Sequence, residues 1–138
     1  MKVEWIRLET VLIFHDLQVT EHGGAAGLRD EGALRSALAR PENLAAYGDP
    51  NLFDLAAAYA KGIVQNHPFV DGNKRTAFVV AASFLDLNGQ ELSAPEADAA
   101  LVFLRLAASE LTETELAEWL RQNSSAPAVA SRDPEQDK

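Results

Sequence analysis

The stretch "HPFVDGNKRTAFVVAASFLDL", residues 67–87, joins a polar loop to a long apolar run. From Thr76 onward the run is apolar on almost every side, which is typical of a helix buried at the centre of a domain. Asn88 and Gly89 follow directly and indicate its end. The pattern therefore predicts a central helix over about residues 74–88.

Apolar residues at helical spacing predict further helices on both sides of this one. They fall at about residues 5–21, 30–40, 52–66, 94–109 and 112–122. Asp30, Asn51 and Thr112 are predicted N-caps, the last completing a capping box with Glu115. Pro41 is predicted to lie beyond the end of the second helix, since proline interrupts helical hydrogen bonding.

The pattern predicts no strand and no repeat, so the fold class expected is all-α, a compact helical domain over residues 1–122. Residues 123–138 lack large apolar side chains and are predicted to form a disordered tail.

Composition excludes several classes of protein. The chain has 138 residues, of which 47% are hydrophobic and 24% charged, as in ordinary globular domains. It has no cysteine and therefore no disulfide framework. No apolar stretch approaches the ~20 residues of a membrane span, and the start does not resemble a signal peptide. We expect a cytoplasmic protein without a membrane partner.

The net charge of −9 argues against nucleic-acid binding, which requires an excess of basic residues on one face. The charge is uneven, because residues 1–75 carry a net −2 and residues 76–138 a net −7. Lys74 and Arg75 end the less acidic part, in the first turn of the predicted central helix. Each cation there is unfavourable by about 0.3–1 kcal/mol, because the helix dipole is positive at that end.

Taken singly, the loop residues have structural explanations. Pro68 can turn the chain, Asp71 and Gly72 are a common turn pair, Asn73 is a plausible N-cap, and His67 can cap the preceding helix.

Together the same residues predict a site for phosphoryl-type transfer. Gly72 lets an anion approach the backbone N–H groups at the helix start, and Lys74 and Arg75 add charge-assisted bonds to it. Asp71 offers a hard oxygen to Mg²⁺, which usually holds phosphates through one or two carboxylates. His67 is suited to remove a proton from an attacking hydroxyl. Phe69, between these polar groups, is predicted to anchor the loop in the core.

The segment "HPFVDGNKRTAF", residues 67–78, resembles the active-site motif of the Fic/Doc superfamily, specifically its Doc ("death on curing") toxin branch. "GLRDEGALRSALARP" (residues 27–41) and "FLDLNG" (residues 84–89) are also similar to Doc proteins. The resemblance implies His67 as general base, Phe69 as buried anchor and Asp71 as Mg²⁺ ligand. It also implies a nucleotide-phosphate site at Gly72, Asn73, Lys74 and Arg75.

Members of the superfamily that transfer AMP usually read His-Pro-Phe-x-(Asp/Glu)-Gly-Asn-Gly-Arg-x-x-Arg. Lys74 replaces the glycine here, and Phe78 stands at the second arginine. In Doc-type members this change accompanies transfer of the γ-phosphate of ATP. The resemblance thus implies a serine/threonine-directed protein kinase that modifies a threonine of translation elongation factor Tu and halts translation.

Two alternatives remain open from the sequence. One is a Fic-type nucleotidyl (AMP) transferase acting on another protein, and the other is an inactive binding module. The inhibitory pattern (Ser/Thr)-x-x-x-Glu-(Gly/Asn) of many Fic proteins is not met, because Gly27 and Leu38 stand four residues before Glu31 and Glu42. The resemblance therefore implies restraint by a separate antitoxin of the Phd type.

Overall fold

The computed structural model describes residues 2–127 and contains six α-helices and two very short strands within that range. The elements in chain order are α1 (Leu8–His22), α2 (Glu31–Tyr47), α3 (Leu52–Asn66), α4 (Asn73–Leu87), β1 (Glu91–Leu92), α5 (Glu96–Ala107), α6 (Glu113–Gln122) and β2 (Ser124–Ser125). The expected all-α class is confirmed. No helix among the described residues is long and apolar enough to cross a bilayer.

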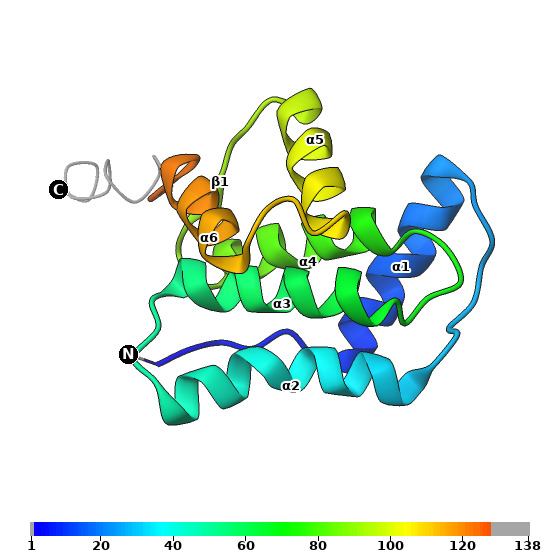
Figure 1. The fold of residues 1–138 in the computed structure, drawn as a ribbon, viewed down its shortest axis with the longest axis horizontal. Coiled ribbons are helices and arrows are strands. Elements are labelled where there is room, and N and C mark those ends of the chain that lie inside the picture. Colours follow the sequence, from blue (N-terminus) through cyan, green and yellow to red (C-terminus); the bar gives the residue numbers. More distant parts are fainter. Residues whose placement is uncertain (1, 128–138) are drawn as a thin grey trace, which may run out of the picture.

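Helices α3 and α4 share the centre of the molecule (Figure 1). Helix α3 packs against α2, α4, α5 and α6, while α4 packs against α1, α3, α5 and β1. Three consecutive alanines, Ala56–Ala58, are buried on α3 and let its neighbours approach closely. The expected burial of α4 is confirmed, and α3 is buried at least as fully.

Local signals explain most helix boundaries. The side chain of Asp30 accepts a hydrogen bond from the Ala33 amide at 3.0 Å, so the predicted N-cap of α2 is confirmed. Asn51 and Thr112 each form a complete capping box, as their sequences indicate.

The prediction that α2 ends before Pro41 is wrong. The helix continues through Pro41, which is buried, and ends at Tyr47. Packing explains the difference, because α2 and α3 approach so closely that a Cβ at Gly62 would lie 3.1 Å from the Cα of Ala37. Tertiary contact of this kind outweighs the local helix-breaking effect of proline.

The prediction of no strand is also wrong in detail. β1 and β2 pair antiparallel, with Glu91 opposite Ser125 and Leu92 opposite Ser124. The predicted tail therefore contains two paired residues, Ser124 and Ser125, and residues 128–138 lie outside the described part of the chain.

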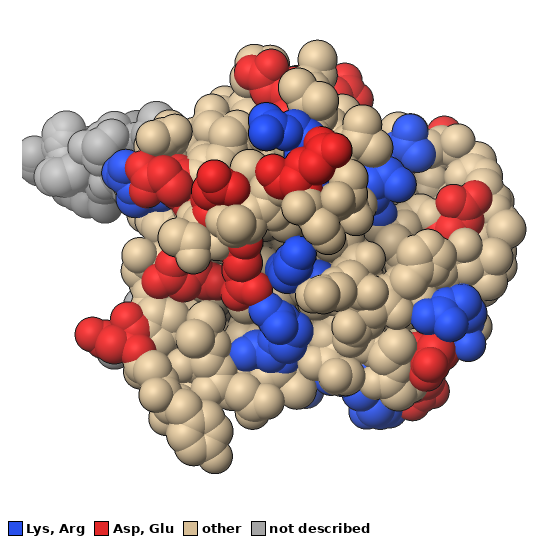
Figure 2. Space-filling view, in the orientation of Figure 1, with Lys and Arg blue, Asp and Glu red and all other residues tan. Residues whose placement is uncertain are grey.

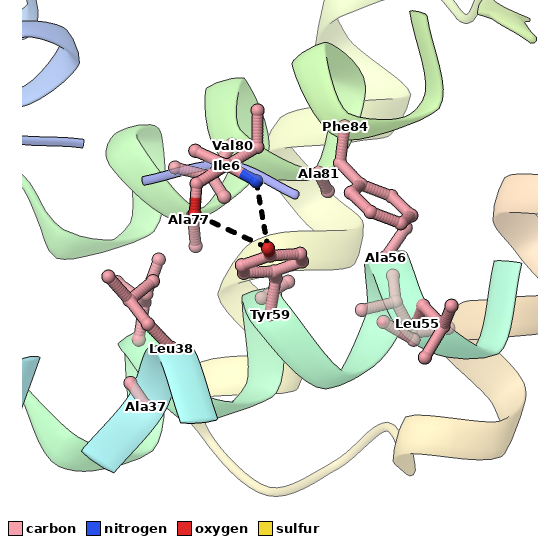
Figure 3. Close-up of a cluster of buried hydrophobic side chains, with 14 of the residues drawn as sticks. Ile6, Ala37, Leu38, Leu55, Ala56, Tyr59, Ala77, Val80, Ala81 and Phe84 are labelled. Carbon is pink, nitrogen blue, oxygen red and sulfur yellow. Dashed lines mark hydrogen bonds between the residues drawn. The ribbon is translucent and has the colours of Figure 1, made fainter. Parts of the chain in front are cut away.

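The phenol of Tyr59 fastens the N-terminal segment to the core (Figure 3). Its oxygen accepts a hydrogen bond from the Ile6 amide at 3.0 Å and donates to the Ile6 carbonyl at 3.4 Å. Burial raises the pKa of Tyr59 to about 12. The residues before α1 are thereby held where α1 packs along α4.

Candidate active site

The motif forms the loop between the two central helices. Helix α3 ends at Asn66 and its C-cap is His67, whose φ of 51° and ψ of 55° are left-handed. Helix α4 begins after Gly72, whose φ is 78°. Left-handed backbone costs a non-glycine residue about 1–2 kcal/mol. The imidazole of His67 is exposed at this turn, so the predicted C-cap position and an accessible ring coexist.

A segment from the α1–α2 connection holds the first half of the loop. The guanidinium of Arg29 donates from Nε to the His67 carbonyl at 2.7 Å and from a terminal nitrogen to the Asn66 carbonyl at 3.0 Å. The backbone N–H of Arg29 donates to the Pro68 carbonyl at 2.7 Å, and that of Val70 to the Gly27 carbonyl at 3.1 Å. These bonds fix the left-handed turn from outside the motif.

Phe69 and Asn73 close the second half of the loop. Phe69 is fully buried, as expected of the anchor. The Asn73 side chain accepts a hydrogen bond from the Phe69 amide and donates to the Phe69 carbonyl, both at 3.0 Å. The prediction of Asn73 as N-cap is wrong, because Gly72 occupies that position and Asn73 is the first helical residue. Its buried side-chain amide holds the loop, and its backbone N–H has no hydrogen-bond partner within residues 2–127.

His15 of α1 lies beneath the loop and is 2% exposed. Its ring stacks on Phe69, with centroids 3.8 Å apart and planes 7° from parallel, and its Nε2 lies 2.8 Å from the Asp71 carbonyl oxygen. Sequence reasoning did not identify His15 as part of the site. The available signal was its spacing, four residues after the buried Val11, which places a polar ring on the buried face of α1.

The carboxylate of Asp71 is exposed and receives two backbone hydrogen bonds. The Ala25 amide donates to one oxygen at 3.3 Å and the Gly72 amide to the other at 2.9 Å. These bonds, the Ala25 bond first, lower the pKa of Asp71, and the charges of Lys74 and Arg75 lower it further. A Cβ at Gly24 would lie 2.9 Å from the carboxylate, so a residue with no side chain is needed there.

The first turn of α4 presents unpaired donors and cations together. The N–H groups of Asn73, Lys74 and Arg75 precede the first bond of the helix, from the Thr76 amide to the Gly72 carbonyl, and have no hydrogen-bond partner within residues 2–127. Lys74 and Arg75 are exposed, and in the same range neither forms an ion pair. No acidic side chain stands in that turn. This is the arrangement that binds phosphate at helix N-termini.

Phe78 occupies the position of the second arginine in AMP-transferring relatives. It is half-buried and meets Phe103 of α5 edge to face, with centroids 5.4 Å apart. This position of α4 therefore contributes to helix packing rather than to charge.

Asp71 is the carboxylate available to a metal in the loop. No three acidic, histidine or cysteine side chains gather into a metal-binding cluster in the described part of the chain. A single ionised carboxylate beside a helix start with unpaired N–H groups fits Mg²⁺, which keeps several waters and usually takes its other ligands from phosphates. The same donor set does not fit zinc, which requires several nitrogen or sulfur ligands.

The charged surface agrees with a small anionic ligand. On the face drawn in Figure 2, basic side chains alternate with acidic ones over the described residues. Two shallow hollows of about 340 and 330 Å³ lie elsewhere, one beside the end of α4 at Asp86 and the other beside Asp49 and Glu113. No residue of the motif lines either hollow.

The structure thus brings His67, Asp71, Gly72, Lys74 and Arg75 to one loop and helix start, as the sequence predicts, with Phe69 below them. Their catalytic and binding roles stay predictions. Arg29 and Gly24 support the same loop and were not identified from the sequence, because their partners lie more than 35 residues away in the chain.

Comparison with known proteins gives concordant matches. A model of the Fic/DOC family matches residues 5–85. The Toxin Doc of Mycolicibacterium smegmatis is 47% identical over 75 residues, which is 52% of this chain and 57% of that protein. The chain thus spans little more than half the length of that relative. The Protein kinase doc of Escherichia phage P1 is 32% identical over 116 residues, 83% of this chain and 90% of that protein. The chain belongs to the Fic/DOC family, in its Doc branch.

Proposed function

We propose that this protein is a Doc-like toxin, a protein kinase that transfers the γ-phosphate of ATP to a serine or threonine hydroxyl of a translation factor such as elongation factor Tu. One observation carries the proposal. The exposed imidazole of His67 and the carboxylate of Asp71 lie in the loop just before α4. Among the described residues, the first turn of α4 has three unpaired N–H groups and two unpaired cations. The relative named Protein kinase doc supports assignment as a kinase.

In the proposed step the target hydroxyl lies beside His67. Its oxygen bonds to the γ-phosphorus of ATP while the bond from that phosphorus to the β–γ bridging oxygen breaks. ADP leaves with the electron pair, and the hydroxyl proton passes to a ring nitrogen of His67. A general base of this kind contributes about 10²–10⁴-fold to the rate.

Asp71 would hold the Mg²⁺ that accompanies ATP, and a bound ion there would supply positive charge to the phosphates. Lys74, Arg75 and the N–H groups of the first turn of α4 bind the phosphate oxygens. Positioning and electrostatic stabilisation account for most catalysis of phosphoryl transfer. The loop needs rigidity for that purpose, and the bonds of Arg29 and Asn73 supply it.

The choice of the γ-phosphate over AMP rests on Lys74 and Phe78. A lysine side chain replaces glycine in the turn, and Phe78 packs on Phe103, so position 78 supplies no arginine to a polyphosphate. Nucleotidyl transfer to another protein is the second candidate. His67, Asp71 and Arg75 match positions that the AMP-transferring and the Doc patterns share.

Labelled ATP tests the proposal directly. Purified protein is incubated with elongation factor Tu, Mg²⁺ and ATP labelled at the α- or the γ-phosphate. We expect label on the target from γ-labelled ATP alone. Label from α-labelled ATP would establish nucleotidyl transfer, and no label on any protein of a bacterial extract would leave an inactive binding module. The variant Lys74→Gly with Phe78→Arg, which restores the nucleotidylating pattern, is the matched comparison for the choice of phosphate.

An antitoxin of the Phd type completes the proposal. Its disordered C-terminal segment would fold on binding as an amphipathic helix against apolar surface of the toxin. Ile13 and Leu17, one turn apart on α1, are 58% and 56% exposed and offer such surface on the helix that supports the loop. The toxin named among the relatives supports a toxin–antitoxin pair.

A further inference from the structure

His15 is a buried ionisable side chain that the proposed reaction does not use. It is 2% exposed and lies in α1, 56 residues before its partner in the loop. A buried imidazole needs a hydrogen bond to offset its loss of water. Its Nε2 lies 2.8 Å from the carbonyl oxygen of Asp71. A carbonyl can only accept, so Nε2 carries the proton and donates it.

The ring of His15 also contacts both ends of the turn. It stacks on Phe69 at 3.8 Å, and a Cβ at Gly72 would lie 3.6 Å from its Cδ2, an ordinary contact distance. The ring of His15 on α1 therefore packs against residues 69–72. The backbone of Phe69 is also held, by two hydrogen bonds to the side chain of Asn73.

One peptide plane connects His15 to the Asp71 carboxylate. The bond between Asp71 and Gly72 is planar and trans, so its carbonyl and its N–H point in opposite directions. The carbonyl points to His15, and the Gly72 N–H donates to Oδ1 of Asp71 at 2.9 Å. Rotation of this plane would break both bonds at once. Its orientation keeps the carboxylate on the side away from α1.

We propose that His15 is a positioning residue, which holds the Asp71 carbonyl and thereby orients the carboxylate that receives Mg²⁺. This inference rests on the proposed function for the role of Asp71. Residues that orient a metal ligand without touching the metal typically change metal affinity or activity by about 10–100-fold when replaced.

Two variants separate the hydrogen bond from the stacking. His15→Phe keeps a flat ring on Phe69 and loses the donor, whereas His15→Gln keeps a donor. Val11→Ala removes buried side-chain volume one turn earlier in α1 and controls for loss of stability. Calorimetry measures binding of ATP at several Mg²⁺ concentrations, and NMR follows the Gly72 amide resonance without nucleotide. We expect His15→Phe to shift that resonance and to weaken Mg²⁺-dependent ATP binding about tenfold or more. His15→Gln should restore most of both, and Val11→Ala should change neither.

Several results would overturn the inference. These are an unchanged Gly72 resonance in folded His15→Phe, equal losses of ATP binding in His15→Phe and Val11→Ala, or unfolding of both His15 variants, which would assign His15 to the fold as a whole. If the wild-type protein binds no ATP with Mg²⁺, the proposed function fails, and the Gly72 resonance alone decides whether His15 orients the peptide.

Discussion

At the scale of single residues, the loop depends on backbone conformations that most side chains avoid. His67 adopts a left-handed conformation with φ of 51°, and strain of this kind persists only where neighbours enforce it. Arg29 enforces this conformation, because its guanidinium donates hydrogen bonds to the carbonyls of Asn66 and His67. The protein's own hydrogen bonds therefore hold the loop in this conformation. On the proposed function, they supply the pre-organisation that phosphoryl transfer requires.

Replacing His67 by alanine tests its role as the base. We expect phosphate transfer to fall about 10²–10⁴-fold, because the target hydroxyl loses its proton acceptor. Thermal unfolding should change little, since the ring is exposed. Gln65→Ala, a nearby exposed change at the end of α3, is the control and should keep full transfer. A well-folded His67→Ala protein with wild-type activity would exclude His67 as the base.

Gly24 and Gly23 form a matched pair for testing the Asp71 carboxylate. Both have positive φ, 113° and 82°, so alanine strains the backbone at either position. A Cβ at Gly24 meets the carboxylate at 2.9 Å, whereas one at Gly23 meets nothing within 4 Å. We expect each variant to lose about 1 kcal/mol of stability, and Gly24→Ala alone to raise the Mg²⁺ concentration needed for transfer about tenfold. Equal Mg²⁺ requirements in the two variants would contradict this role.

At the scale of elements, α3 links the N-terminal segment, the core and the loop. Its Tyr59 holds Ile6 at the middle of the helix, and its left-handed C-cap places His67 at the end. Loss of either bond set should leave α3 helical, because its capping box and its seven buried residues other than Tyr59 do not depend on these bonds. We therefore expect changes at Tyr59 to affect stability without altering the chemistry.

Tyr59 predicts how stability depends on alkaline pH. Its folded pKa of about 12 exceeds the ordinary 10.0, so the unfolded chain releases the phenolic proton first as pH rises. The contribution to the free energy of unfolding is complete below pH 10 and falls toward pH 12, by about 1.4 kcal/mol for each pH unit between the two pKa values. Urea unfolding between pH 9 and pH 11.5 measures it, and Tyr59→Phe should lack this component. Identical slopes for the two proteins would contradict the assignment.

The sequence predicts those elements whose signals are local. Asn51 and Thr112 cap their helices through residues three positions away, and both are confirmed. Pro41 misleads because contact between α2 and α3 outweighs its local effect. The residues of the loop are adjacent in sequence and were all predicted. Their supports, His15 and Arg29, act across 37–56 residues, and no local pattern reveals such pairings.

At the scale of the whole molecule, the side chains of His67, Asp71, Lys74 and Arg75 are all exposed among the described residues. Glu31 and Glu42, the glutamates nearest to the inhibitory pattern, lie in α2. In the described part of the chain, neither residue forms a hydrogen bond with His67 or Arg75. On the proposed function, an active kinase of this kind needs restraint from another protein.

Expression in a bacterium tests the toxin and antitoxin proposals together. We expect the wild-type protein alone to arrest growth, since modified elongation factor Tu would stop translation. His67→Ala at equal abundance should not arrest it, and co-expression of the adjacent small open reading frame should relieve the arrest. Growth rate and protein abundance are measured in parallel. Normal growth with abundant, folded wild-type protein would count against both proposals.

The first turn of α4 has a consequence for the selection of this sequence. Each of the other five helices within residues 2–127 carries an acidic residue in its first turn, where it favours the helix dipole. Helix α4 carries two cations and unpaired N–H groups instead. Selection for stability alone would remove these two cations. Their presence therefore indicates that some stability has been given up for function. On the proposed function, bound nucleotide offsets the unfavourable interaction of these cations with the helix dipole. The free energy of unfolding should therefore be highest when ATP is bound.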